Sequence, residues 1–143
     1  MKNPRILIVW SNYHHALAEE QLEGCLKLLQ NSKYTFEIET VRAGCYEIPS
    51  VIRTYQKQKP FDAYIALGLL LKGETDHYEF IFQHVKDCFL KFSMDGLLIG
   101  NGIISAPNSE LLTKRVKSAE RTLEAFNAVD YLLDFHNRLL NNL

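Results

Sequence analysis

The chain has 143 residues, of which 47% are hydrophobic and 23% are charged, and its formal net charge is −1. The length fits one domain, and the hydrophobic fraction excludes wholesale disorder. A domain of this size buries about 70% of the surface that its unfolded chain exposes, so it needs neither a metal nor disulfides to fold. A net charge near zero gives no overall attraction to nucleic acid or to an anionic membrane, so any recognition of phosphate must be local.

The cysteines and the apolar runs predict a reduced, soluble protein. Cys25, Cys45 and Cys88 stand far apart, and no Cys-x-x-Cys pair or Cys/His spacing typical of zinc occurs. This usage favours free thiols in the cytoplasm. The apolar run after Arg5 is too short for a signal peptide, and no stretch approaches the roughly 18 apolar residues of a membrane span.

Four short apolar runs alternate with longer stretches of helical periodicity. The runs predict strands at Ile6–Trp10, Thr35–Val41, Ala63–Leu71 and Leu97–Ile104. The stretches after them predict helices over residues 14–31, Glu47–Gln58, Asp76–Phe92 and Ser109 to about Leu140, the last in one or two pieces. Alternating strands and helices predict a three-layer α/β/α sandwich around a four-stranded parallel sheet, of the flavodoxin-like kind. With no linker or internal repeat, residues 1–143 are expected to form this single domain.

The strongest functional signal follows the third predicted strand, since open parallel sheets bind ligands beyond the carboxyl ends of their strands. That strand runs out into Lys72 and Gly73, and the next helix is expected to begin after the capping residue Thr75. The free N–H groups of a helix's first turn, with a glycine and a lysine nearby, favour an anion pocket. His77, expected in the same turn, could transfer protons near neutral pH. A capped helix with a surface histidine explains the spacing equally well.

The turns after the first two predicted strands carry weaker signals. Glu47 lies where a carboxylate could bind a polyhydroxylated ligand, although its favourable interaction with the helix dipole is a sufficient explanation. Tyr13 could stack on a heterocycle or simply cover the sheet edge. His14 and His15 are adjacent, so they diverge on a helix and cannot both face one metal. We expect both histidines at the surface.

The remaining candidates lie on the predicted helices. A basic cluster opens the last helical stretch, and its members are Lys114, Arg115, Lys117 and Arg121. Arg115 is the interesting member, because a guanidinium can bind a phosphate with two hydrogen bonds. His84 and His136 have no recognisable partner in the sequence, and we expect structural roles for them.

Two segments resemble the 6,7-dimethyl-8-ribityllumazine synthase family. Residues 73–78, Gly-Glu-Thr-Asp-His-Tyr, are similar to its G-[AE]-T-x-H-[YF] element, and residues 43–49, Ala-Gly-Cys-Tyr-Glu-Ile-Pro, to its P-G-[AS]-[FY]-E-[LI]-P element. Their order and spacing fit from Arg5 to about Arg115. The resemblance implies a transferase of riboflavin biosynthesis that needs no metal or redox cofactor. It would condense 5-amino-6-(D-ribitylamino)uracil with 3,4-dihydroxy-2-butanone 4-phosphate to give 6,7-dimethyl-8-ribityllumazine, phosphate and water.

The resemblance also implies roles for individual residues. His77 matches the catalytic histidine that moves protons. The phosphate of the butanone substrate would be held by Gly73, Glu74, Thr75 and Arg115. The ribitylaminouracil would be bound by Tyr13, Cys45, Tyr46, Glu47, Leu69, Leu70, Leu71 and Asn101. In this set the Tyr13 ring packs on the pyrimidine and the Glu47 carboxylate binds the ribityl chain, while Cys45, Tyr46 and the leucines contribute backbone groups.

The chain departs from the family pattern in two places. Asn101 stands where the family usually has an aromatic residue, so one wall of the pyrimidine pocket is altered. The glycine- and lysine-containing stretch expected after Arg115 is missing, and Arg121 or Lys117 is the candidate replacement for its phosphate-side lysine.

Family sites lie at junctions between subunits, which implies a homopentamer. The first strand begins almost at the start of the chain, and this together with the altered final helices favours a pentamer or decamer over a sixty-subunit shell. Riboflavin synthase is a candidate partner. Three alternatives stay open: a non-catalytic flavin- or lumazine-binding homologue, an archaeal-type riboflavin synthase, and a flavodoxin-like regulator, whose acidic cluster the sequence lacks.

Overall fold

The computed structural model describes residues 3–73 and 77–141. Its strands form one four-stranded parallel sheet with the order β2-β1-β3-β4, which places β1 and β3 in the middle and β2 and β4 at the edges. The strands are β1 (Arg5–Ser11), β2 (Thr35–Val41), β3 (Ala63–Leu71) and β4 (Ile99–Ala106). The predicted class of fold is confirmed.

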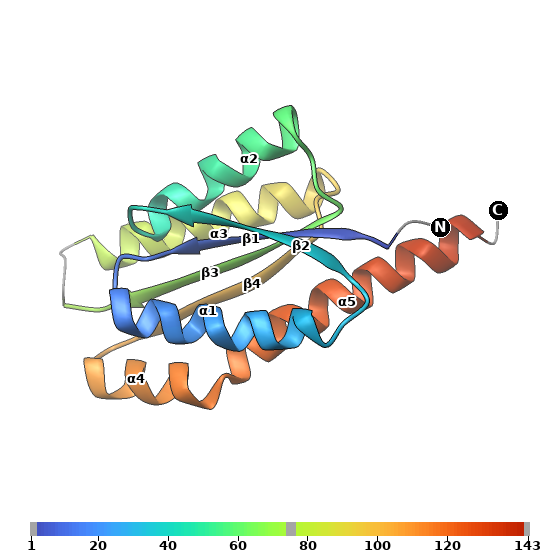
Figure 1. Ribbon diagram of the computed structural model, residues 1–143. Coiled ribbons are helices and arrows are strands. Elements are labelled where there is room, and N and C mark those ends of the chain that lie inside the picture. The colour runs from blue at the N-terminus through green and yellow to red at the C-terminus, as the bar shows by residue number, and fades with distance from the viewer. Residues whose placement is uncertain (1–2, 74–76, 142–143) are drawn as a thin grey trace.

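Helices cover both faces of the sheet (Figure 1). One face packs against α1 (His15–Gln30), α4 (Ser109–Ser118) and α5 (Glu120–Asn141), and the other against α2 (Ile48–Gln58) and α3 (Tyr78–Met94). A short 3-10 helix, η1 (Cys45–Glu47), precedes α2. None of the described helices is both long enough and apolar enough to cross a membrane.

The uniform apolarity of the central strands follows from this sandwich. Along β1, Ile6 and Ile8 belong to the core beneath α1, α4 and α5, whereas Leu7 and Val9 belong to the core beneath α2 and α3. Side chains on both faces of β1 are therefore buried, so apolar and polar residues do not alternate along this strand. The edge strand β2 is less covered, so Ile38 in its middle is exposed despite being apolar.

Some predicted boundaries shift for local reasons. Strand β4 begins two residues later than predicted, because the N–H of Leu97 donates to the carbonyl of Phe92 (2.9 Å) and so closes the turn after α3. The predicted last helix is two helices, because Ala119 adopts a left-handed conformation (φ 58°) between α4 and α5. Helix α3 begins at Tyr78, later than predicted, and the expected capping residue Thr75 lies outside the described residues.

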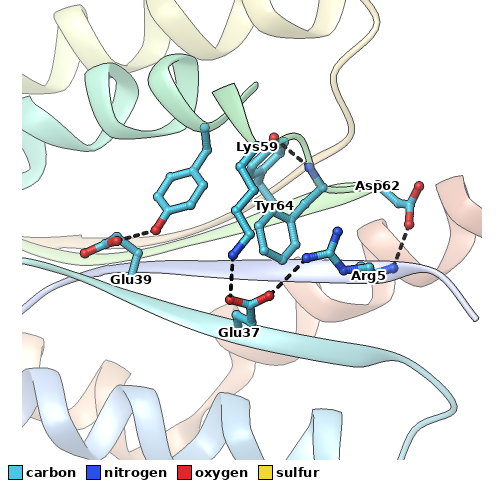
Figure 2. Close-up of polar contacts among 8 residues, drawn as sticks. Arg5, Glu37, Glu39, Lys59, Asp62 and Tyr64 are labelled. Carbon is cyan, nitrogen blue, oxygen red and sulfur yellow. Dashed lines mark hydrogen bonds and ion pairs between the residues drawn. The ribbon is translucent and has the colours of Figure 1, made fainter. Parts of the chain in front are cut away.

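Charged side chains hold the amino ends of the strands together (Figure 2). The guanidinium of Arg5 donates to Glu37 (3.0 Å), which also accepts from Lys59 (3.4 Å), and the Arg5 backbone N–H donates to Asp62 (2.7 Å). The hydrogen bond from Arg5 lowers the pKa of the Glu37 carboxyl despite the opposing effect of desolvation. These contacts join β1, β2 and the turn before β3 at the end of the sheet opposite the predicted site.

Candidate functional site

Hydrogen bonds join the carboxyl ends of β1 and β2. The hydroxyl of Ser11 donates to the carbonyl of Ala43 (2.5 Å), and the N–H of Asn12 donates to the carbonyl of Val41 (3.1 Å). The turn after β1 and the segment leading into η1 therefore lie side by side, as the parallel topology requires. This arrangement brings the predicted residue Tyr13 to the same edge of the sheet as residues 43–47.

Cys45 anchors η1 to the neighbouring strand. Its thiol is buried and donates to the carbonyl of Leu69 on β3 (3.6 Å). Position 68 on β3 requires a glycine, because a Cβ there would lie 2.5 Å from the sulfur of Cys45. Burial raises the pKa of the Cys45 thiol to about 12, so the side chain stays neutral. Cys45 is thus a structural anchor, while the next two residues, Tyr46 and Glu47, are exposed.

Strand β3 ends beside this anchor. Leu69 and Leu70 point into opposite cores and Leu71 is half-buried, so the side chains of Leu69 and Leu70 are committed to packing. The N–H of Lys72 donates to the carbonyl of Ala106 (3.0 Å) and ties β3 to β4.

The predicted phosphate-binding segment begins at a glycine. Gly73 adopts φ 92°, a conformation that favours glycine over every other residue. The Lys72 ammonium lies 3.6 Å from the Glu79 carboxylate in the first turn of α3. The predicted phosphate-binding residues Glu74 and Thr75 lie outside the described residues.

His77 occupies the N-cap position of α3 rather than the first turn. Its side chain is exposed, and its carbonyl accepts the N–H of Ile81 (2.8 Å). Tyr13 is 57% exposed, and its ring meets that of His14 edge-on at 5.1 Å. We call Tyr13, residues 45–47 and His77 the carboxyl-edge group.

A second group of predicted residues lies along the open edge of β4. The Arg115 guanidinium donates to the carbonyl of Ser105 (2.5 Å), and that of Arg121 to the carbonyl of Ile103 (3.3 Å). The Asn101 side chain accepts the N–H of Ile103 (3.0 Å), a group on the side of β4 that has no neighbouring strand. We call Asn101, Arg115 and Arg121 the β4-edge group.

The two arginines share a hollow. Arg115 and Arg121 line a cavity of about 260 Å³ with Glu120 and Glu124. Arg121 also borders a smaller cavity of about 70 Å³, where Asn101 lies. The Lys117 ammonium instead pairs with Glu20 on α1 (3.3 Å). Of the two candidate replacements for the family lysine, Arg121 is therefore the one that joins Arg115.

The sheet register separates Asn101 from the carboxyl-edge group. Asn101 pairs with Ala66, and Ala66 pairs with Val9, so all three lie inside the sheet rather than at its carboxyl end. At about 3.3 Å per residue, Asn101 lies about 16 Å before the end of β4. Arg115 lies nearer that end, because the Ser105 carbonyl that it binds stands opposite Leu70 in the register. Leu70 also borders the small cavity with Asn101 and Arg121.

One contact in the site could not be found from the spacing of the chemistry-bearing residues. The rings of Tyr46 and His84 stack with their centroids 3.8 Å apart and their planes inclined by 18°. His84, expected to be merely structural, thereby touches a residue of the carboxyl-edge group. No sequence pattern indicates this contact, because Tyr46 and His84 lie on different elements far apart along the chain.

The chemistry offered by the two groups is proton transfer and anion binding. The described residues contain no cluster of three His, Cys, Asp or Glu side chains that could hold a metal. They supply an imidazole, a carboxylate and two guanidiniums, all exposed. The fold is that of a parallel α/β protein, and its candidate site offers groups for proton transfer and for binding an anion.

Comparison with known proteins identifies the family. The sequence model of the 6,7-dimethyl-8-ribityllumazine synthase family matches residues 3–137. A 6,7-dimethyl-8-ribityllumazine synthase of Bartonella bacilliformis is 33% identical over 88% of this chain and 84% of its own. Another, of Erythrobacter litoralis, is 31% identical over 94% of this chain and 96% of its own. The chain belongs to the 6,7-dimethyl-8-ribityllumazine synthase family, which confirms the resemblance and makes it an enzyme of riboflavin biosynthesis; the alternatives are not favoured.

Proposed function

We propose that this chain condenses 5-amino-6-(D-ribitylamino)uracil with 3,4-dihydroxy-2-butanone 4-phosphate. The products would be 6,7-dimethyl-8-ribityllumazine, inorganic phosphate and water. The observation that carries the proposal is the contact of η1, which bears Glu47, with α3, which begins directly after His77, in a member of this family.

The reaction explains why these groups are needed. The 5-amino nitrogen of the uracil forms a bond to the ketone carbon, whose oxygen leaves as water, and the phosphate then departs with its bonding electron pair. The second nitrogen closes the ring with loss of a further water. Each step moves protons, which is the role we assign to His77. Holding the two reacting ends together contributes about 7–11 kcal/mol in favourable systems, so positioning matters more than the proton shuttle.

We assign the uracil substrate to the carboxyl-edge group. Tyr13, with its ring exposed at the lip of the sheet, would pack on the pyrimidine, and the Glu47 carboxylate would accept hydrogen bonds from the ribityl hydroxyls. The backbone groups of Cys45, Tyr46 and residues 69–71 would border the pyrimidine. The leucines are suited to this role because their side chains are committed to the cores.

We assign the butanone phosphate to both groups. The turn at Gly73, Glu74 and Thr75 would supply backbone N–H groups, and Arg115 would add a charge-assisted hydrogen bond. Arg121 supports this assignment as a second cation, because it lines the same cavity as Arg115.

A second copy of the chain would then complete each site. The position of Arg115 and Arg121 along the open edge of β4, which has no neighbouring strand in the sheet, supports a homopentamer or decamer whose sites lie between subunits. Exposed apolar side chains on α3 also support it, since Phe80 is 65% and Met94 80% exposed. Cytoplasmic location and an association with riboflavin synthase remain parts of this proposal.

Incubation of the purified protein with both substrates tests the reaction. We expect lumazine fluorescence to rise with release of one phosphate per lumazine, and neither signal to appear when the ketone phosphate is left out. Tight binding of the uracil without product would contradict the proposal and indicate a binding homologue. Conversion of lumazine to riboflavin would contradict it in favour of a riboflavin synthase.

A further inference from the structure

The outer side of η1 is held by an aromatic contact to α3. The Tyr46 ring lies nearly parallel to that of His84, with centroids 3.8 Å apart, and to that of Phe80, with centroids 6.4 Å apart. Tyr46 is 39% exposed, so its ring rests on the surface of α3 rather than in the core. Stacked aromatic pairs of this kind contribute beyond the area that they bury.

The inner side of η1 is held by the preceding residue. The Cys45 thiol contacts the Leu69 carbonyl, in space left open by Gly68. Successive residues of η1 thus reach in opposite directions, Cys45 into the sheet and Tyr46 onto α3. The helix itself is only Cys45–Glu47, closed by a bond from the Glu47 N–H to the Gly44 carbonyl (3.3 Å). Such a short 3-10 turn depends on its side-chain contacts for its position.

His84 also links η1 to the helix that begins beside His77. The two histidines are seven positions apart, about 10.5 Å along the helix axis and on the same face. The stack on Tyr46 therefore fixes the place of Glu47, the next residue, relative to α3. We propose that His84 is a positioning residue for the uracil substrate, whose ring holds Tyr46 against α3 and thereby sets Glu47 opposite the ribityl chain. This inference rests on the proposed function.

The contact with Tyr46 depends on the flat ring of His84 and not on either of its imidazole nitrogens. The Cys88 sulfur lies 3.9 and 3.8 Å from the two ring nitrogens of His84, so it contacts the ring from the next turn of α3 without singling out either nitrogen. A stack needs only a planar partner of similar size. His84→Phe therefore keeps the contact with Tyr46, whereas His84→Ala removes it.

The test measures the KM for each substrate, kcat, and the dissociation constant of the ribitylaminouracil by direct titration. For His84→Ala we expect the KM and the dissociation constant for the uracil to rise about 3- to 10-fold, the range that one aromatic pair sustains. The KM for the butanone phosphate and kcat should stay within about twofold of the wild type. His84→Phe should restore both uracil values, and Gln83→Ala on the neighbouring helix position should leave them unchanged.

Three results would overturn the inference: uracil values for His84→Ala equal to those of the wild type, equal increases for both substrates, or failure of His84→Phe to restore binding. Tyr46→Leu provides an independent check if His84→Ala does not fold. The double variant Tyr46→Leu/His84→Leu should bind the uracil no more weakly than either single variant does, since both substitutions remove the same ring contact. Wild-type protein that binds the uracil without forming lumazine would refute the proposed reaction, and the titration would still decide the role of His84.

Discussion

The carboxyl-edge group and the β4-edge group are built in different ways. The first is held by hydrogen bonds across the ends of neighbouring strands, such as that from Ser11 to Ala43. The second sits on a strand edge that has no neighbour in the sheet, where Arg115 and Arg121 bind the outward carbonyls of β4. Contacts between neighbouring strands thus hold the groups proposed for proton transfer and ribityl binding, while the cations lie on an exposed edge of the sheet.

The largest effect is expected at the carboxyl-edge group. His77→Ala should lower kcat about 10²- to 10³-fold and leave some activity, because positioning and phosphate binding survive the loss of a proton shuttle. The KM values should change little. Steady-state kinetics with each substrate varied in turn would measure this, and a kcat equal to that of the wild type would remove His77 from the mechanism.

The second-largest effect is expected at the β4-edge group, where a substitution should change KM instead of kcat. Arg115→Ala should raise the KM for the butanone phosphate about 10- to 100-fold, since a hydrogen bond to a charged group is lost. The KM for the uracil should stay the same. Lys117→Ala is the matched control, because that lysine pairs with Glu20 on α1. Equal KM increases for both substrates would contradict the division between the groups.

Mixing the two variants tests whether the groups come from different subunits. If each site takes His77 from one chain and Arg115 from the next around a ring, random assembly of equal amounts of the variants gives about a quarter of the sites both residues intact. Co-refolded His77→Ala and Arg115→Ala chains should therefore recover about a quarter of the wild-type rate. Activity that stays at the level of the separate variants would place both residues in one chain's site.

The smallest effect concerns the anchor of η1. Gly68→Ala should destabilise the fold by about 1–3 kcal/mol, because the added Cβ would lie 2.5 Å from the Cys45 sulfur. Adding Cys45→Ala should relieve most of this loss. Denaturant unfolding measures the free energy of unfolding of both variants. Gly24→Ala is the control, since nothing lies within 4 Å of a Cβ at that position. It should raise the free energy of unfolding by about 1 kcal/mol at most, because alanine favours a helix more than glycine does. A loss of stability at Gly68 that persists with Cys45→Ala would show that the sulfur is not the cause.

Much of this arrangement could be predicted from the sequence, for identifiable reasons. Strands β2 and β3 begin and end where their apolar runs do, because periodicity and burial are local properties. The positions of Tyr13, Glu47 and His77 at one edge follow from the parallel order alone. The start of α3 and the break at Ala119 depend on backbone conformation at single residues, and periodicity does not reveal this.

The class of fold and the family could be predicted from the sequence alone, because apolar patterning and short motifs consist of consecutive residues. Only the tertiary structure decided which of the predicted site residues meet. It set Arg121 rather than Lys117 beside Arg115, gave His84 its partner in Tyr46, and placed Asn101 inside the sheet, away from the carboxyl ends of the strands. Strand order, register and packing bring together or separate residues that are distant along the chain. A pattern of consecutive residues does not contain this information.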